Sequence, residues 1–478
     1  MDWEKNGNKN NKKFYIHTFG CQMNFHDSEK ISGILSENGF SESPDGEGAD
    51  LVIFNTCSIR EKAEQKFLSE LGRIRKLKRQ KPGLRIAVAG CVAQQMGEEL
   101  LKKAPYVDYV IGPQNLHAIK DIVPSRDEKA ADMPLLSVDE NPELASMELP
   151  AARKKRPGAW VSIMYGCDNF CTYCIVPHTR GREVCRPWES IRREVAGLAS
   201  EDFKEVTFLG QNVNSYRSWG LDFPGMLELA NSIDGIERIR FVTSHPRDLS
   251  DRLIRAFGTL GKLCEHIHLP LQSGSDPILA RMNRRYTFAL YREKIERLRH
   301  QAPGISITTD IIAGFPGETD EDHEATMTAL REIEYDGIFA FKYSPRPGTA
   351  ASVFEKQVPD DVRAQRLNDI LALQNEITAR KNTSLVGTVQ EVMIEGPSEK
   401  DEKKLTGKTR SNKIVNFDPG VALEETKGLK KKAAAKKEDF CPGRIVNIRI
   451  VRAGLHSLEG RFFTGNDAGL SPEDGTRL

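Results

Sequence analysis

The chain has 478 residues, of which 39% are hydrophobic and 29% are charged, and its formal net charge is +1. This length allows two to four domains with sizeable cores, and the composition excludes a disordered chain. No apolar run approaches the roughly 18 residues of a membrane span, and the near-neutral charge means that any basic surface for a nucleic acid must be local.

Residues 1–12 are polar and rich in Asn and Lys, and they lack the apolar segment of a secretory signal peptide. We therefore expect a frayed tail on a cytoplasmic protein that has no membrane partner. The nine cysteines lie in motifs within a long chain, which favours metal or redox chemistry over a disulfide framework.

Between residues 13 and 124, short apolar strands alternate with helices. The expected strands are 14–18, 51–54, 85–89 and 106–111, and the expected helices include 27–38 and 60–79. Repeated strand–turn–helix units predict a parallel sheet with right-handed crossover connections.

A cysteine follows three of these strands, at Cys21, Cys57 and Cys91. Neighbouring parallel strands end along one edge of their sheet, so we expect the three thiols to meet there. A buried cysteine also packs as a small apolar side chain, and core packing is the alternative for each of them. Three cysteines at equivalent turns favour a site with three thiolate ligands, which suits an iron–sulfur cluster.

Residues 125–157 are polar, acidic and rich in Pro and Ala, which predicts a linker on the protein surface. The basic run Arg153-Lys154-Lys155-Arg156 closes this segment. It is either solvated or placed to contact a phosphate.

From residue 158 to residue 383, the pattern predicts a partial (β/α)6 barrel of the TIM type. Its helices include 188–198, 250–257, 291–299 and 320–334, and its six strands are 159–165, 205–209, 239–243, 266–269, 305–312 and 338–341. In such barrels the active site lies at the carboxyl ends of the strands.

Cys167, Cys171 and Cys174 follow the first of these strands with the spacing C-x3-C-x2-C. Three ligands would leave one iron of a 4Fe-4S cluster without a protein ligand. An open coordination position of this kind distinguishes reactive metal centres from structural ones. A structural zinc site completed by His178 is the alternative. The aromatic Phe170, between the cysteines, fits a cluster that is shielded from water.

This spacing, with the aromatic Tyr173 before the last cysteine, resembles that of the radical S-adenosylmethionine superfamily. The resemblance implies that S-adenosylmethionine chelates the open iron through its amino and carboxylate groups. It also implies that one electron cleaves this cofactor to methionine and a 5′-deoxyadenosyl radical.

Polar motifs follow the later strands of the barrel as well. Each alone is ordinary turn chemistry, but several at the same end of successive strands predict a shared pocket. The resemblance places Gly210, Gln211 and Asn212 where the superfamily binds the amino group of S-adenosylmethionine. Further cofactor or substrate contacts are expected from Ser244, His245, Gln272 and Ser273. Cys185 and Cys264 have no partner at ligand spacing, so we expect neither to bind a cluster.

Residues 384–453 alternate in short strands and predict a small all-β barrel of oligonucleotide-binding size, followed by a tail at 454–478. It resembles the TRAM domain, an RNA-binding module, with a basic strand pair at 407–413; a passive cap is the alternative. An insertion at 427–437 holds six lysines and no acidic residue, so it either contacts phosphates or is an inert loop.

The residues around the first three cysteines narrow the resemblance to the methylthiotransferase family, over residues 12–462. The motifs are Gly20-Cys21-Gln22-Met23-Asn24, Asn55-Thr56-Cys57-Ser58-Ile59-Arg60 and Ala89-Gly90-Cys91. The resemblance implies two 4Fe-4S clusters, one on Cys167, Cys171 and Cys174, and an auxiliary cluster on Cys21, Cys57 and Cys91 that holds a sulfur methylated by a first S-adenosylmethionine.

The implied reaction is methylthiolation at C2 of an isopentenylated adenosine beside the tRNA anticodon, with the small barrel on the anticodon stem-loop. The implied partners are an electron donor such as flavodoxin or ferredoxin and a sulfur source or cluster-assembly carrier. We expect the enzyme to be a monomer. Relatives that modify a ribosomal-protein aspartate or threonylcarbamoyl-adenosine in tRNA are the nearest alternatives. A non-catalytic RNA-binding protein with zinc or a cluster is a more distant one.

Overall fold

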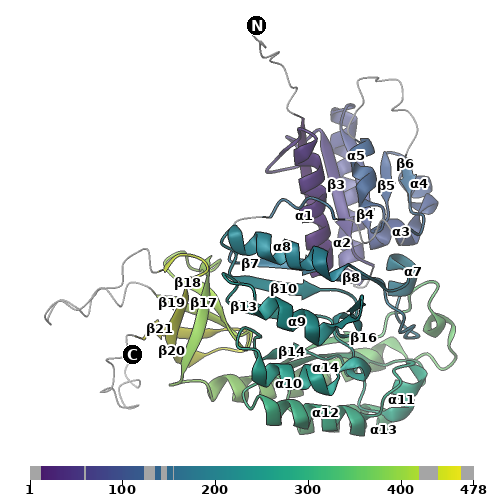
Figure 1. The fold of residues 1–478 in the computed structure, drawn as a ribbon. Helices are drawn as coiled ribbons and strands as arrows, with labels where there is room; N and C mark the ends of the chain where they lie inside the picture. Colours follow the sequence, from purple (N-terminus) through teal and green to yellow (C-terminus); the bar gives the residue numbers. More distant parts are fainter. Residues whose placement is uncertain are drawn as a thin grey trace, which may run out of the picture.

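In a computed structural model of the chain, the described residues are 12–58, 61–122, 135–141, 148–153, 156–418 and 440–463. They form an α/β domain, an open β/α barrel and a small closed β-barrel in chain order (Figure 1). None of the helices in these ranges combines the length and the apolar composition needed to cross a membrane.

The amino-terminal domain is a parallel sheet with a hydrophobic core on each face. Its strand order is β2-β1-β3-β4-β5-β6, with β1 at Lys13–Thr18, β2 at Ser41–Glu42, β3 at Leu51–Thr56, β4 at Arg85–Gly90, β5 at Tyr109–Ile111 and β6 at Leu135–Ser137. The predicted parallel sheet is therefore confirmed. The prediction was wrong in one respect, because part of the presumed linker 125–157 forms β6 and pairs with β5. Three residues are too few for a strand to show its period in the sequence.

The helices α1 (Gln22–Glu37), α2 (Glu61–Gln80), α3 (Cys91–Met96) and α4 (Glu98–Lys103) connect these strands. Helix α1 begins five residues earlier than expected. Cys21 and Asn24 form a reciprocal cap at its start, which replaces the Ser or Thr that usually marks a helix start in a sequence. Helix α1 therefore starts directly after Cys21, and α3 starts at Cys91.

The central domain contains the six predicted barrel strands in two groups, β13-β10-β7 and β14-β15-β16. A bridge between Ile239 and Leu263 joins the groups. The strands are β7 (Gly158–Ser162), β10 (Glu205–Leu209), β13 (Arg238–Phe241), β14 (His266–His268), β15 (Ser306–Ala313) and β16 (Gly337–Lys342). Within the described ranges no pairing joins β7 to β16, so the barrel is open between these strands.

Helices cover the outside of this barrel, and the four predicted helices are present as α8 (Trp188–Ser200), α10 (Asp251–Thr259), α12 (Phe288–Gln301) and α13 (Asp320–Ile333). The first expected strand, 159–165, is divided. Its second part, β8 (Met164–Tyr165), leaves the barrel and pairs with β9 (Val184–Cys185). The long α14 (Asp360–Thr383) packs on β16 and leads into the small barrel.

The carboxyl-terminal domain is a closed barrel of five strands in the order β17-β18-β19-β21-β20. These are β17 (Val389–Pro397), β18 (Leu405–Thr409), β19 (Ile414–Asp418), β20 (Ile445–Ala453) and β21 (Leu458–Phe462). The prediction that a tail starts at residue 454 was wrong, since β21 closes the barrel by pairing with β19 and β20. The lysine-rich insertion 427–437 lies outside the described residues.

Buried arginines attach the small barrel to the central one. Arg238 Nη1 donates to the carbonyl oxygen of Lys408 over 2.7 Å, and Arg240 Nη2 donates to that of Thr409 over 2.8 Å. Arg410 returns the contact by donating to both carboxylate oxygens of Glu265. These bonds hold the basic hairpin of the small barrel against β13 and β14.

Candidate metal and cofactor site

Cys21, Cys57 and Cys91 follow the neighbouring strands β1, β3 and β4 at one edge of the sheet, and their thiols are close enough to influence one another's pKa. A hydrogen bond with Cys57 lowers the pKa of the Cys21 thiol to about 6, although burial opposes this shift. Burial raises the pKa of the Cys91 thiol, and the charge of Cys21 adds to that rise. A Cβ at Gly20, which has a φ of +124°, would collide with Cys57, so only glycine allows this close approach.

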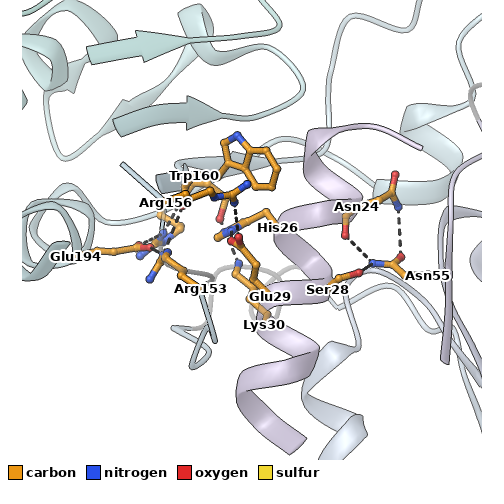
Figure 2. Close-up of polar contacts among 12 residues, drawn as sticks. Asn24, His26, Ser28, Glu29, Lys30, Asn55, Arg153, Arg156, Trp160 and Glu194 are labelled. Carbon is orange, nitrogen blue, oxygen red and sulfur yellow. Dashed lines mark hydrogen bonds and ion pairs between the residues drawn. The ribbon is translucent and has the colours of Figure 1, made fainter. Parts of the chain in front are cut away.

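Asparagines lock the start of α1 to the end of β3 beside these thiols (Figure 2). Asn24 Nδ2 donates to the carbonyl oxygen of Thr56 over 3.1 Å, and Asn55 Nδ2 donates to the carbonyl oxygen of Asn24 over 2.7 Å. Both asparagines are fully buried. The positions of Cys21 and Cys57 are therefore fixed by a satisfied polar network.

Cys167, Cys171 and Cys174 lie in the loop between β8 and α7 (Val176–Arg180), at the carboxyl end of the barrel. Asn169 Nδ2 donates to the sulfur of Cys167 over 3.4 Å. Burial raises the pKa of the Cys174 thiol to about 12, and the charge of Cys171 contributes to this rise. Closely spaced thiols resist ionisation in a dry site until a metal binds them, since a coordinating thiol is deprotonated.

The zinc alternative depends on His178 as the fourth ligand beside Cys167, Cys171 and Cys174. Across the described ranges, no group of three or more His, Cys, Asp or Glu side chains is placed to hold a metal ion. His178 is exposed on α7. A cluster takes one thiolate on each iron, so its ligands stand farther apart than those around one ion. The two sets of three cysteines therefore stay a prediction as cluster ligands.

The predicted pocket residues follow β10, β13 and β14 at the same end of the barrel. Gln211 Oε1 and Asn212 Oδ1 are buried without a hydrogen-bond partner, so they remain available to a donor such as an ammonium group. His245 Nε2 is also unpartnered, and burial lowers the pKa of His245 to about 2, which keeps the ring neutral.

The other predicted pocket residues are bonded within the protein. Ser244 Oγ donates to the carbonyl oxygen of His268, and Ser273 Oγ lies 3.3 Å from Thr326 Oγ1. The main chain of Gln272 pairs with β15, at a φ of +74°. Gly210 packs against Met164, which a Cβ would strike. These four residues therefore lie at the carboxyl ends of β10, β13 and β14 with their positions fixed by the protein itself.

Two buried arginines next to the thiols were not anticipated from the sequence. Arg284 Nη1 donates to the sulfur of Cys171 over 3.4 Å. The positive charge of Arg180, which comes from α7, opposes the effect of burial on the pKa of Cys91. A single arginine has no spacing or period to distinguish it, because arginines are mostly exposed. Cys185 and Cys264 belong to neither set of thiols, and burial raises the pKa of each to about 11.

The basic run at 153–156 does not serve as a free phosphate site in its described part. Arg153 pairs with Glu194, and Arg156 pairs with Glu29 of α1 and lies 3.9 Å above the ring of Trp160 (Figure 2). These contacts clamp the amino-terminal domain onto the barrel. Lys154 and Lys155 lie outside the described residues.

A cavity of about 390 Å³ lies where the three domains meet. Its lining includes Gln22 next to Cys21, Trp160 and His266 inside the barrel, and Lys408 and Asn412 of the small barrel. This volume is large enough for a nucleobase-sized group, which would contact all three domains.

Aromatic side chains flank the opening of the barrel. Phe339 and Phe341 lie on one face of the edge strand β16 and are 52% and 40% exposed. The ring of His268 packs edge-on against Phe339 at 5.8 Å. On the opposite edge, Phe25 of α1 lies 6.2 Å from Trp160 of β7. Exposed rings of this kind suit stacking with unpaired bases.

The three domains match known families in the same order. Residues 13–112 match the family described as Uncharacterized protein family UPF0004, residues 161–330 match the Radical SAM superfamily, and residues 383–463 match the TRAM domain. The fold also resembles the solved structure of TsrM, a radical S-adenosylmethionine methyltransferase from Kitasatospora setae. The TM-score is 0.51 at 14% identity, over 72% of this chain and 74% of that one. The predicted fold class is thus confirmed.

Much closer relatives bear the name tRNA-2-methylthio-N(6)-dimethylallyladenosine synthase. One from Thermodesulfovibrio yellowstonii is 52% identical over 446 residues, which cover 93% of this chain and 97% of that one. Another from Clostridium botulinum is 45% identical, with 94% and 96% coverage, and one from Syntrophus aciditrophicus is 47% identical, with 94% of each chain covered. By this identity over almost its whole length, the chain belongs to the family of tRNA-2-methylthio-N(6)-dimethylallyladenosine synthases.

Proposed function

We infer that this protein adds a methylthio group to C2 of an N6-dimethylallyl (isopentenyl) adenosine in tRNA, next to the anticodon. The observation that carries the inference is the presence of two sets of three cysteines in a chain that matches a tRNA-2-methylthio-N(6)-dimethylallyladenosine synthase over 93% of its length. Enzymes of this family carry two 4Fe-4S clusters and use S-adenosylmethionine.

Insertion of sulfur at an aromatic C–H bond has no acid–base route, so the clusters and S-adenosylmethionine supply a radical and a sulfur atom that side chains cannot. Cys167, Cys171 and Cys174 would hold the cluster that binds S-adenosylmethionine. The free oxygens of Gln211 and Asn212 would accept hydrogen bonds from its ammonium group. The neutral His245 ring adds no positive charge there.

Cys21, Cys57 and Cys91 would hold the auxiliary cluster and the sulfur that is transferred. Gln22, beside the first of them, lines the three-domain cavity, so the sulfur site and the proposed base site are neighbours. The adenosine must leave its stack to enter this space, as in other enzymes that act on bases. The small barrel would bind the anticodon stem-loop through its shape and its phosphates.

The proposed partners follow from what the reaction consumes. Cleavage of S-adenosylmethionine needs an electron donor such as flavodoxin or ferredoxin, and the transferred sulfur must be replaced by a sulfur source or a cluster-assembly carrier. We place this reaction in the cytoplasm with the tRNA substrate, and we propose that the enzyme acts as a monomer.

The test is mass spectrometry of tRNA nucleosides from cells that lack their own enzyme, with and without this gene. We expect 2-methylthio-N6-isopentenyladenosine only in cells that carry it. Cys171→Ala should abolish both this nucleoside and 5′-deoxyadenosine formation, whereas Cys57→Ala should abolish only the nucleoside. The exposed Cys441→Ala serves as the control. A methylthio group found instead on a ribosomal-protein aspartate or on threonylcarbamoyl-adenosine would overturn the substrate assignment.

A further inference from the structure

A single peptide segment connects the two cysteine sites. Gln114 Nε2, in the amino-terminal domain, donates to the carbonyl oxygen of Arg180 over 2.8 Å. The amide of Cys167, in the barrel, donates to the carbonyl oxygen of Gly181 over 3.2 Å. Two consecutive carbonyl groups therefore accept hydrogen bonds from opposite sides of the domain boundary, one of them from a residue of a cysteine site.

The side chain of Arg180 extends from this segment into the amino-terminal domain. Its Nη2 lies 2.8 Å from Oδ2 of Asp27 on α1, and both side chains are almost completely buried. Helix α7, which ends at Arg180, packs against α3, which begins at Cys91. Arg180 is thus part of the barrel domain in the sequence, but its side chain lies beside the Cys21, Cys57 and Cys91 site of the amino-terminal domain.

The hydrogen bonds of Arg180 are incomplete. The Cys91 thiol, which is a weak acceptor, interacts with the Arg180 guanidinium, but the buried Nη1 makes no well-formed hydrogen bond, and Oδ1 of Asp27 makes none either. A buried guanidinium is costly unless its N–H groups are well satisfied, so a donor that meets only a weak thiol acceptor favours a stronger sulfur acceptor at that site. Arg284 at the other cysteine site makes this kind of contact, because its Nη1 donates to the sulfur of Cys171.

We propose that Arg180 is a positioning residue for the sulfur to be transferred, and this proposal rests on the proposed function. Its Nη1 donates a hydrogen bond to a sulfur atom held at the Cys21, Cys57 and Cys91 site, and its main chain ties that site to the loop of Cys167. A cation at this point favours an anionic sulfur ligand, such as a methylthiolate, and favours the reduced state of the cluster.

The experiment uses full-length protein with Cys167, Cys171 and Cys174 replaced by Ala, reconstituted so that only the auxiliary cluster is present. Methanethiolate is the probe, and its binding and the midpoint potential are followed by electron paramagnetic resonance. For Arg180→Met we expect about tenfold weaker binding or more, from the loss of a charge-assisted hydrogen bond, and a more negative potential. Arg180→Lys keeps the positive charge, so the midpoint potential of its cluster should stay close to that of the unsubstituted protein, but it should bind methanethiolate weakly. Arg193→Met, an exposed arginine of α8, is the matched control.

A role as a domain latch alone predicts a different result. Asp27→Asn weakens the latch but leaves Nη1 of Arg180 in place, so we expect near-normal affinity for methanethiolate in this variant. Equal losses in Asp27→Asn and Arg180→Met would overturn the proposal, as would an unchanged affinity in Arg180→Met. If Arg180→Met does not assemble its cluster, Arg180→Lys decides by the same affinity. None of these measurements involves tRNA, so a failure of the proposed function would be seen separately, in the nucleoside analysis.

Discussion

Arg284 donates a hydrogen bond from Nη1 to the sulfur of Cys171 over 3.4 Å, although 113 positions separate the two residues in the sequence. Its other nitrogens are also used: Nη2 donates to the carbonyl oxygen of Pro270 over 3.0 Å, and Nε donates to the Tyr286 hydroxyl over 2.9 Å. The guanidinium is buried, with each nitrogen bonded. It therefore provides a fixed positive charge beside one cysteine of the barrel site.

Replacing Arg284 by Met should impair this site selectively. The substitution removes the hydrogen bond to the sulfur of Cys171 and one of the two donors to the buried carbonyl oxygen of Pro270, which keeps only the Tyr286 hydroxyl. We expect the iron content to fall toward that of one cluster and 5′-deoxyadenosine formation to fall at least tenfold. Iron and sulfide analysis with chromatography of 5′-deoxyadenosine would measure both. The neighbouring Arg285, which is exposed, is the control, and normal iron content in Arg284→Met would contradict the prediction.

Gly181→Ala should weaken the attachment of the two domains. Gly181 has a φ of +74°, and an added Cβ would collide with Nε2 of Gln114, which bonds to Arg180. Strain at such a position costs roughly 1–3 kcal/mol. We expect a lower midpoint in urea unfolding and faster proteolysis between the domains. The double variant Gly181→Ala with Gln114→Ala relieves the collision but not the backbone strain, so full recovery in it would show that strain is unimportant here.

Buried histidines should make the protein less stable in mild acid. Burial lowers the pKa of His245 to about 2 and that of His266 to about 3, below the roughly 6.5 of an unfolded chain. As the pH falls below 6.5, the unfolded state takes up the protons first, so stability is lost in that window. Each histidine should lower the free energy of unfolding by about 2 kcal/mol at pH 5 relative to pH 8. Urea unfolding at both pH values measures this loss, which His266→Asn should reduce and the exposed His300→Asn should not.

Phe339 and Phe341 should contribute to RNA affinity. Stacking of a base on an aromatic ring is worth about 1–3 kcal/mol, so replacing either residue by Ala should weaken binding of an anticodon stem-loop roughly tenfold. A fully paired RNA of equal length should bind these variants and the native protein alike. Trp219 is 86% exposed and lies in the turn between β11 (Arg217–Ser218) and β12 (Leu221–Asp222), not on β16, so Trp219→Ala provides the control. Equal losses for the paired RNA would mean that the two rings do not contact bases.

The sequence predicted that Cys21, Cys57 and Cys91 lie along one edge of the sheet, because parallel strands end at one edge and each of these cysteines follows a strand. The same rule placed Gln211, Asn212 and His245 at the carboxyl end of the barrel. It had no means of identifying Arg180 or Arg284, since their burial depends on residues far away in the chain. Strands β6 and β21 were missed because their identity comes from pairing partners and not from a local pattern.

The unpaired edges of β7 and β16 have a consequence for how substrate enters. A closed barrel of this class fills its interior with side chains, whereas here the wall is discontinuous. A base that has left its stack therefore enters a barrel in which no pairing between β7 and β16 has to break. The slow event in substrate capture would then belong to the RNA, in the unstacking of its anticodon loop, and tRNAs with looser loops would be captured faster.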